Sequence, residues 1–123
     1  MTVTAYTLAV LLDLFCVFLG YRFWFRPGPA AAGYGVPADP HGDARAYLSV
    51  KGLRDGTLGL VGLALLAFAG VRAEAWFMLC VALVPFVDTF IVLRHGGRKA
   101  VAFGIHFATA IVVLIGAGLL FAV

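Results

Sequence analysis

Four long apolar runs, separated by polar connections, are the feature of this sequence that most constrains its fold. They cover residues 3–25, 50–72, 75–94 and 100–123. A helix needs about 20 predominantly apolar residues to cross about 30 Å of hydrocarbon, and each run is long enough. With 63% hydrophobic and only 12% charged residues, a soluble domain of this size has too little interior for so much apolar surface. The sequence therefore predicts an all-α integral membrane four-helix bundle, a single transmembrane domain over residues 1–123.

The charged, sulfur and imidazole side chains argue against several classes of function. The net charge of +3 forms no basic patch on a soluble face, so nucleic acid is not an expected partner. Cys16 and Cys80 lie in apolar runs without C-x-x-C spacing and are expected to be small core residues. His41, His95 and His106 lack the spacing of metal ligands, and no phosphate-binding or dinucleotide motif is present. We therefore expect neither a metal nor a cofactor.

Lysine and arginine are concentrated in two connections. The first two spans are joined through Arg22, Arg26, Arg45, Lys51 and Arg54, and the last two through Arg94, Arg98 and Lys99. The turn between the second and third spans has only Arg72, balanced by Glu74. The positive-inside rule then predicts a multi-pass protein of the cell membrane with both basic connections cytoplasmic and both termini extracytoplasmic. Because M-T-V-T-A-Y-T has no basic region, we expect the first span to be retained rather than cleaved as a signal peptide.

The connection over residues 26–43 is rich in proline and glycine. Proline lacks an N–H and glycine favours turns, so neither a helix nor a strand is expected there. Its apolar residues, among them Tyr34, leave two alternatives open: a lid over the cytoplasmic mouth of the bundle, or a linker. Asp43 is the expected N-cap of the helix that follows.

Two short segments suggest an internal repeat. V-L-L-D-L-F-C-V (10–17) aligns with P-F-V-D-T-F-I-V (85–92), which superposes Asp13 on Asp88. A second alignment sets Arg54 against His106. Each half would then be a helical hairpin, and the two would be parallel repeats about an axis along the membrane normal.

Helix length predicts the depth of several polar residues. Gly56–Val71, the uncharged part of the second span, has 16 residues and covers only about 24 Å. This shortfall against about 30 Å of hydrocarbon draws Arg54 and Asp55 into the inner margin of the membrane. The same measure places Asp88 and His106 at a similar depth. The sequence therefore predicts one polar layer on the cytoplasmic side.

Ionised groups inside a membrane need partners. A charge at the centre of a membrane helix costs about 2.5–3.5 kcal/mol on insertion scales. We therefore expect Arg54 to pair with Asp88 or Asp55, with His106 completing the network, while Asp13 lies deeper, near the midplane. Two interpretations remain open: these contacts hold the helices together, or they line a polar pocket that opens to the cytoplasm.

Several motifs occur together and in order along the chain. They are R-F-W-F-R-P, A-A-G-Y-G-V-P, Y-L-S-V-K-G-L-R-D, L-V-P-F-V-D-T-F-I-V-L, H-G-G-R-K-A and I-H-F-A-T-A. With them the chain resembles a family of small four-span membrane proteins from bacteria and fungi, known only as a domain of unknown function. The resemblance implies a membrane four-helix bundle and brings no activity with it. The polar positions that it implies are Arg22, Lys51, Arg54, Asp55, Asp88 and His106.

The first functional hypothesis is a membrane-embedded enzyme, an isomerase or cyclase that binds a lipophilic small molecule in the polar pocket. Its catalytic residues would be Asp88, His106 and Asp55. Its substrate-binding residues would be Arg54, Lys51, Arg22, Asp13 and Tyr34. Histidine exchanges protons near neutral pH, an aspartate acts as acid or base, and a cation stabilises a developing oxyanion. Lys51 alternatively serves as a solvated residue at the entry of its helix.

Two other hypotheses remain. One is a non-catalytic binding or scaffold subunit, whose H-G-G-R-K loop contacts anionic lipid headgroups. The other is a small proton-coupled transporter that acts as a homo-oligomer, with Asp13 as its intramembrane acid. The lipid bilayer is a partner in all three.

Overall fold

All 123 residues of the chain are described by a computed structural model, which contains helices and no strands. Four helices are long and apolar enough to cross a membrane: Thr2–Phe25, Ala44–Ala69, Val71–Arg94 and Lys99–Phe121. The predicted all-α four-helix architecture is therefore confirmed, and the chain is a multi-pass integral membrane protein. Its orientation across the membrane stays a prediction.

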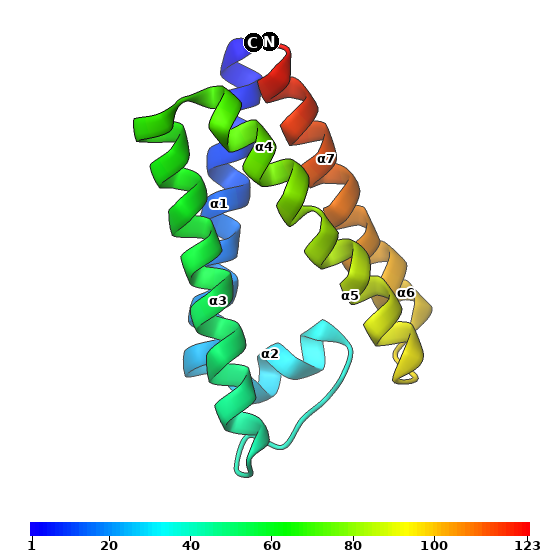
Figure 1. Cartoon of the computed structure of the whole chain (residues 1–123). Coiled ribbons are helices and arrows are strands. Elements are labelled where there is room, and N and C mark those ends of the chain that lie inside the picture. The colour runs from blue at the N-terminus through cyan, green and yellow to red at the C-terminus, as the bar shows by residue number, and fades with distance from the viewer.

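The four spans form two hairpins (Figure 1). The first hairpin consists of α1 (Thr2–Phe25) and α3 (Ala44–Ala64), which continues as a π-helical turn, η1 (Leu65–Ala69). The second consists of α4 (Val71–Val81) and α5 (Leu83–Arg94), followed by α6 (Lys99–Val101), π-helical η2 (Ala102–Phe107) and α7 (Ala108–Phe121). The two chain ends lie together at one end of the bundle, and the hairpins diverge toward the other.

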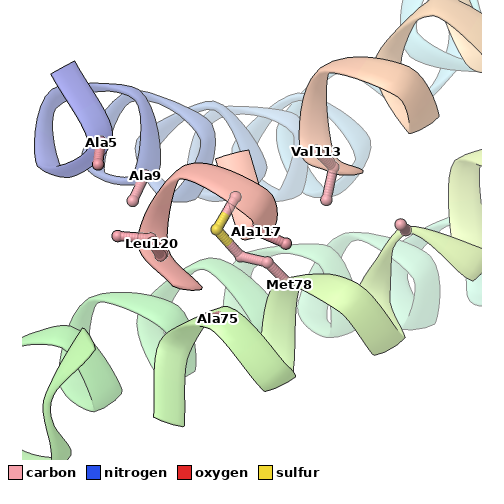
Figure 2. Close-up of a cluster of buried hydrophobic side chains, with 8 residues drawn as sticks. Ala5, Ala9, Ala75, Met78, Val113, Ala117 and Leu120 are labelled. Atoms are coloured by element: carbon pink, nitrogen blue, oxygen red, sulfur yellow. The ribbon is translucent and has the colours of Figure 1, made fainter. Parts of the chain in front are cut away.

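The core between the hairpins is rich in alanine, which supplies five of its eight residues. Its eight residues, drawn in Figure 2, are Ala5, Ala9, Ala75, Met78, Ala82, Val113, Ala117 and Leu120. Small residues let membrane helices approach closely, which matters because lipid provides no hydrophobic drive for their association. Large hydrophobic side chains such as Phe68, Leu83 and Ile115 lie on the outside of the bundle. This inside-out distribution suits a fold whose solvent is lipid.

Within the first hairpin, α1 and α3 approach each other through glycines. A Cβ added to Gly20 would lie 2.5 Å from the Gly56 nitrogen and 2.6 Å from the Gly52 carbonyl oxygen. Both distances are far below van der Waals contact, so the backbones have no room for a side chain. Gly52 and Gly56 of α3 therefore form a packing surface for α1.

The connection over residues 26–43 contains a helix, α2 (Pro27–Tyr34), so the expectation that no helix forms there is wrong. Pro27 occupies the first helical position, where an N–H has no intrahelical partner and a fixed φ suits the helix. Gly35 ends α2 with a φ of 107°, a conformation that glycine adopts readily. In Figure 1, α2 lies between α3 and α5, at the end where the hairpins diverge.

The helices of the second and third spans extend beyond the apolar runs that predicted them. The second begins at Ala44, directly after Asp43, whose side chain makes no capping hydrogen bond. The third begins at Val71 and is interrupted between α4 and α5. The interruption follows from Pro85, which has no N–H to donate to the carbonyl of Val81.

Candidate functional site

Tyr34, at the end of α2, joins the short helix to the second hairpin. Its hydroxyl donates a hydrogen bond of 2.7 Å to Asp88 Oδ1 on α5. Its backbone carbonyl accepts one of 2.7 Å from His106 Nε2 on η2. The rings of Tyr34 and His106 also lie against each other, with centroids 4.6 Å apart. We call Tyr34, Asp88 and His106 the tyrosine cluster.

The contact with the Tyr34 carbonyl fixes the tautomer of His106. A carbonyl only accepts hydrogen bonds, so Nε2 carries the proton that it donates. Nδ1 then lies 4.0 Å from Asp88 Oδ2, close enough for an ion pair when the ring is protonated. His106 sits in η2, and π-helical turns within α-helices occur frequently at functional sites.

A second polar pair on α3 adjoins the tyrosine cluster. Lys51 Nζ lies 3.0 Å from Asp55 Oδ2, one helical turn away. The same ammonium lies 4.8 Å from the ring centroid of Phe23 and 5.2 Å from that of Tyr34, distances typical of cation–π contacts. The structure therefore brings five of the predicted residues together at the α2 end of the bundle: Tyr34, Lys51, Asp55, Asp88 and His106.

The expected pairing of Arg54 with Asp55 or Asp88 is wrong. Asp55 pairs with Lys51, and Arg54 is exposed and makes no ion pair. The reason is helical geometry, because positions four apart share a face whereas the position before Asp55 points elsewhere. Arg22 is half-buried on α1, and its side chain likewise makes no ion pair.

The environment of Tyr34 keeps its hydroxyl protonated. Burial raises the pKa of the phenol, and the hydrogen bond to Asp88 and the negative charges of the aspartates raise it further. The pKa therefore lies well above the ordinary value of about 10. At neutral pH the Tyr34 hydroxyl is a stable donor to the Asp88 carboxylate.

Tyr34 and Lys51 also line a cleft of about 330 Å³ between α2, α3 and α5. Nine of its 11 lining residues are hydrophobic, and Lys51 and His95 are the other two. Asp55, Asp88 and His106 do not line it. The space beside the predicted polar residues is thus an apolar cleft with one ammonium, and Tyr34 lies between it and Asp88.

Asp13 lies apart from these residues, although it was predicted to share the ligand site. Its carboxyl group packs against Gly62 of α3 and faces Glu74 of α4. Glu74 was missed as a site residue because the sequence suggested only a surface charge that balances Arg72. The available signal was its position one turn inside an apolar helix. We call Asp13 and Glu74 the carboxyl pair.

The histidine, cysteine and acidic side chains are dispersed through the fold. No group of three or more histidine, cysteine, aspartate or glutamate residues lies close enough together to hold one. Cys16 and Cys80 are free thiols. The tyrosine cluster and the Lys51–Asp55 pair present hydroxyl, carboxyl, imidazole and ammonium groups.

Comparison with known proteins agrees with this architecture. A family model described as Domain of unknown function (DUF4267) matches residues 14–120. The match begins within α1, directly after Asp13, and includes α2, the tyrosine cluster and Glu74. The chain matches no curated protein and no solved structure.

Proposed function

We propose that this chain, which belongs to the family of the domain of unknown function DUF4267, binds a lipophilic small molecule beneath α2 and moves a proton on it without a cofactor. One observation carries the proposal: Tyr34 lines an apolar cleft while its hydroxyl donates to a half-buried carboxylate. Tyr34 thereby connects the apolar cleft to a proton acceptor, the Asp88 carboxylate.

The cleft supports the binding half of the proposal. A volume of about 330 Å³ lies at the lower end of the range for small-molecule sites, which are mostly apolar with a few polar groups. Lys51 supplies the polar group, and its ion pair with Asp55 and its contact with Phe23 hold it in the wall. The expected ligand is therefore a lipophilic molecule with a carbonyl or anionic oxygen that contacts the Lys51 ammonium.

The tyrosine cluster supports the chemical half. The Tyr34 oxygen accepts a proton from the ligand while its own proton passes to Asp88 Oδ1, so no phenolate forms. This matters because the raised pKa of Tyr34 disfavours a phenolate. His106 positions the cluster through the Tyr34 carbonyl, and its Nδ1 faces the other Asp88 oxygen.

The reaction class follows from this proton balance. One proton leaves an atom of the ligand for the relay, and one returns from the relay to another atom of the ligand. No electrons are exchanged and no co-reactant is consumed, which is the balance of an isomerisation or a cyclisation. Positioned acid–base groups of this kind typically accelerate such steps by about 10²–10⁴-fold.

Deuterium exchange tests both halves. The protein, in lipid nanodiscs, is incubated in D₂O with the total apolar extract of its host membranes, and the bound molecules are identified by mass spectrometry. We expect one lipophile to be retained and to incorporate deuterium. Asp88→Asn and Tyr34→Phe should retain it and slow the exchange at least about 10²-fold. Lys51→Gln should lose it, whereas Arg54→Gln, which removes an exposed cation one turn away, should not.

The outcomes separate the two halves. Retention without exchange in the wild type contradicts the chemistry and identifies a binding protein. Equal retention by wild type and Lys51→Gln contradicts the cleft as the binding site. The melting temperature of each variant in the same nanodiscs shows whether a loss reflects the site or the fold.

A further inference from the structure

The carboxyl pair lies outside the proposed site and carries a second, independent function. We propose that Asp13 and Glu74 form an intramembrane proton-binding site that joins the two hairpins. Asp13 belongs to α1 of the first hairpin and Glu74 to α4 of the second. A proton bound there lies on the boundary between the two halves of the fold.

The main support for this proposal is that both carboxyl groups are buried and lack hydrogen-bond partners. Glu74 is 0% exposed and Asp13 is 5% exposed, and each faces the other. Both Glu74 oxygens and Asp13 Oδ2 are buried and have no hydrogen-bond partner. Gly62 closes the site from α3, since a Cβ at that position would collide with the Asp13 carboxyl. Two facing carboxylates in such a place repel each other, whereas one shared proton provides both attraction and a donor.

No neighbouring cationic side chain pairs with the two carboxyl groups in place of a proton. On α1, the Cys16 thiol lines the same small cavity as Asp13. On α4, Arg72 is exposed and makes no ion pair, and α3 contributes glycine at the contact. On α7, Thr109 lines a cavity of about 40 Å³ that Asp13 also lines. No lysine, arginine or histidine makes an ion pair with either carboxyl group, so a proton is the simplest counter-charge.

The small cavity beside Asp13 has room for a water molecule that could carry the proton to the pair. A space of about 40 Å³ is large enough for one water molecule, which needs room for roughly one probe sphere and a polar neighbour. Asp13 supplies that neighbour, and Thr109 supplies a hydroxyl. Two carboxyl groups provide too few ligands for a divalent cation, which takes six or more oxygens in its usual sites.

Infrared spectroscopy of the full chain in nanodiscs tests the proposal. A protonated carboxyl group absorbs at a higher frequency than a carboxylate and shifts in D₂O. At neutral pH we expect a protonated-carboxyl band in the wild type that is lost in both Glu74→Gln and Asp13→Asn. The matched control is Asp43→Asn, which alters an exposed aspartate and should leave the band unchanged. Each amide has the shape of the protonated acid, so both variants are expected to fold.

Thermal unfolding gives a second, independent measurement. If the native protein holds a proton that the unfolded chain releases, stability falls as pH rises. We expect the melting temperature of the wild type to fall between pH 5 and pH 9, and this slope to flatten in Glu74→Gln. The absence of a protonated-carboxyl band at neutral pH overturns the proposal. A melting temperature that responds to sodium in place of choline, but not to pH, also overturns it and identifies a metal-cation site instead.

Discussion

The tyrosine cluster and the carboxyl pair both hold buried polar groups, but they differ in whether those groups have hydrogen-bond partners. In the tyrosine cluster, every member has a polar partner from another element: Tyr34 binds Asp88 through its hydroxyl and His106 through its carbonyl. In the carboxyl pair, Glu74 has no hydrogen-bond partner at all, although it is the more deeply buried group. The first site is completed by protein groups, whereas the second is completed only when something small binds to it.

The difference arises from α2. This helix fills the space between the diverging hairpins and brings a hydroxyl and a carbonyl to groups that face inward (Figure 1). At the other end, the hairpins meet through alanines and glycines, and no loop segment enters between them. No protein donor reaches the buried oxygens there, and the two acids face each other directly. A site with its own partners suits positioning of a ligand, and a site without them suits binding of a proton.

The largest expected effect on stability is at the carboxyl pair, where Gly62 lies directly against the Asp13 carboxyl. Gly62→Val should destabilise the protein by about 3 kcal/mol, the upper end of the usual cost of overpacking, because the new side chain collides with the Asp13 carboxyl where α3 meets α1. Thermal unfolding in detergent measures the effect. Gly118→Val is the matched control, since a Cβ at Gly118 meets nothing within 4 Å. Equal stability of the two variants would show that the carboxyl pair is looser than the structure indicates.

A smaller effect is expected in the tyrosine cluster, where one hydrogen bond is removed without a change of volume. Tyr34→Phe should cost about 1–2 kcal/mol, because the half-buried Asp88 carboxylate loses its donor. The same unfolding assay applies. Tyr6→Phe removes a hydroxyl that makes no hydrogen bond, and it should leave stability within about 0.5 kcal/mol of the wild type. A neutral Tyr34→Phe would mean that α2 does not hold the cluster together.

The sequence predicted the fold well because membrane spans follow from the length and hydrophobicity of apolar runs. It missed α2 because proline and glycine content was taken as evidence against a helix. At the first helical position, however, proline costs no hydrogen bond, and Gly35 simply ends the helix. The sequence could not show that this segment folds back, since that depends on contacts with Val92 and Val101, far away in the chain.

For the site, helix length predicted depth but not rotation about the helix axis. Depth was enough to group Asp55, Asp88 and His106. It could not decide whether Lys51 or Arg54 faces inward, although the four-residue spacing of Lys51 and Asp55 was a usable signal. Glu74 was missed for another reason, since the helix begins at Val71 rather than at residue 75 and buries the glutamate in its first turn.

The tyrosine cluster also makes a prediction about alkaline pH. Because the pKa of Tyr34 is raised, the folded protein holds this phenol proton where the unfolded chain releases it. Its contribution to stability is therefore fully present below about pH 10 and is lost as pH rises further. In ultraviolet titration to pH 12, folded wild type and folded Tyr34→Phe should show the same tyrosinate absorbance. A larger signal in the wild type would show that Tyr34 ionises and is poorly shielded.

The smallest expected effect separates the two cations of α3. Lys51→Gln should cost about 0.5–1 kcal/mol, since it breaks a partly buried pair one helical turn long and leaves Asp55 without a cation. Arg54→Gln should change the stability by no more than about 0.5 kcal/mol, because the guanidinium is exposed and has no ion-pair partner. The double variant Lys51→Gln with Asp55→Asn measures the coupling between the pair. A larger cost for Arg54→Gln than for Lys51→Gln would reverse the assignment and place the arginine inside the bundle. In that event the cleft would lose the ammonium on which ligand binding depends, while the carboxyl pair would be unaffected.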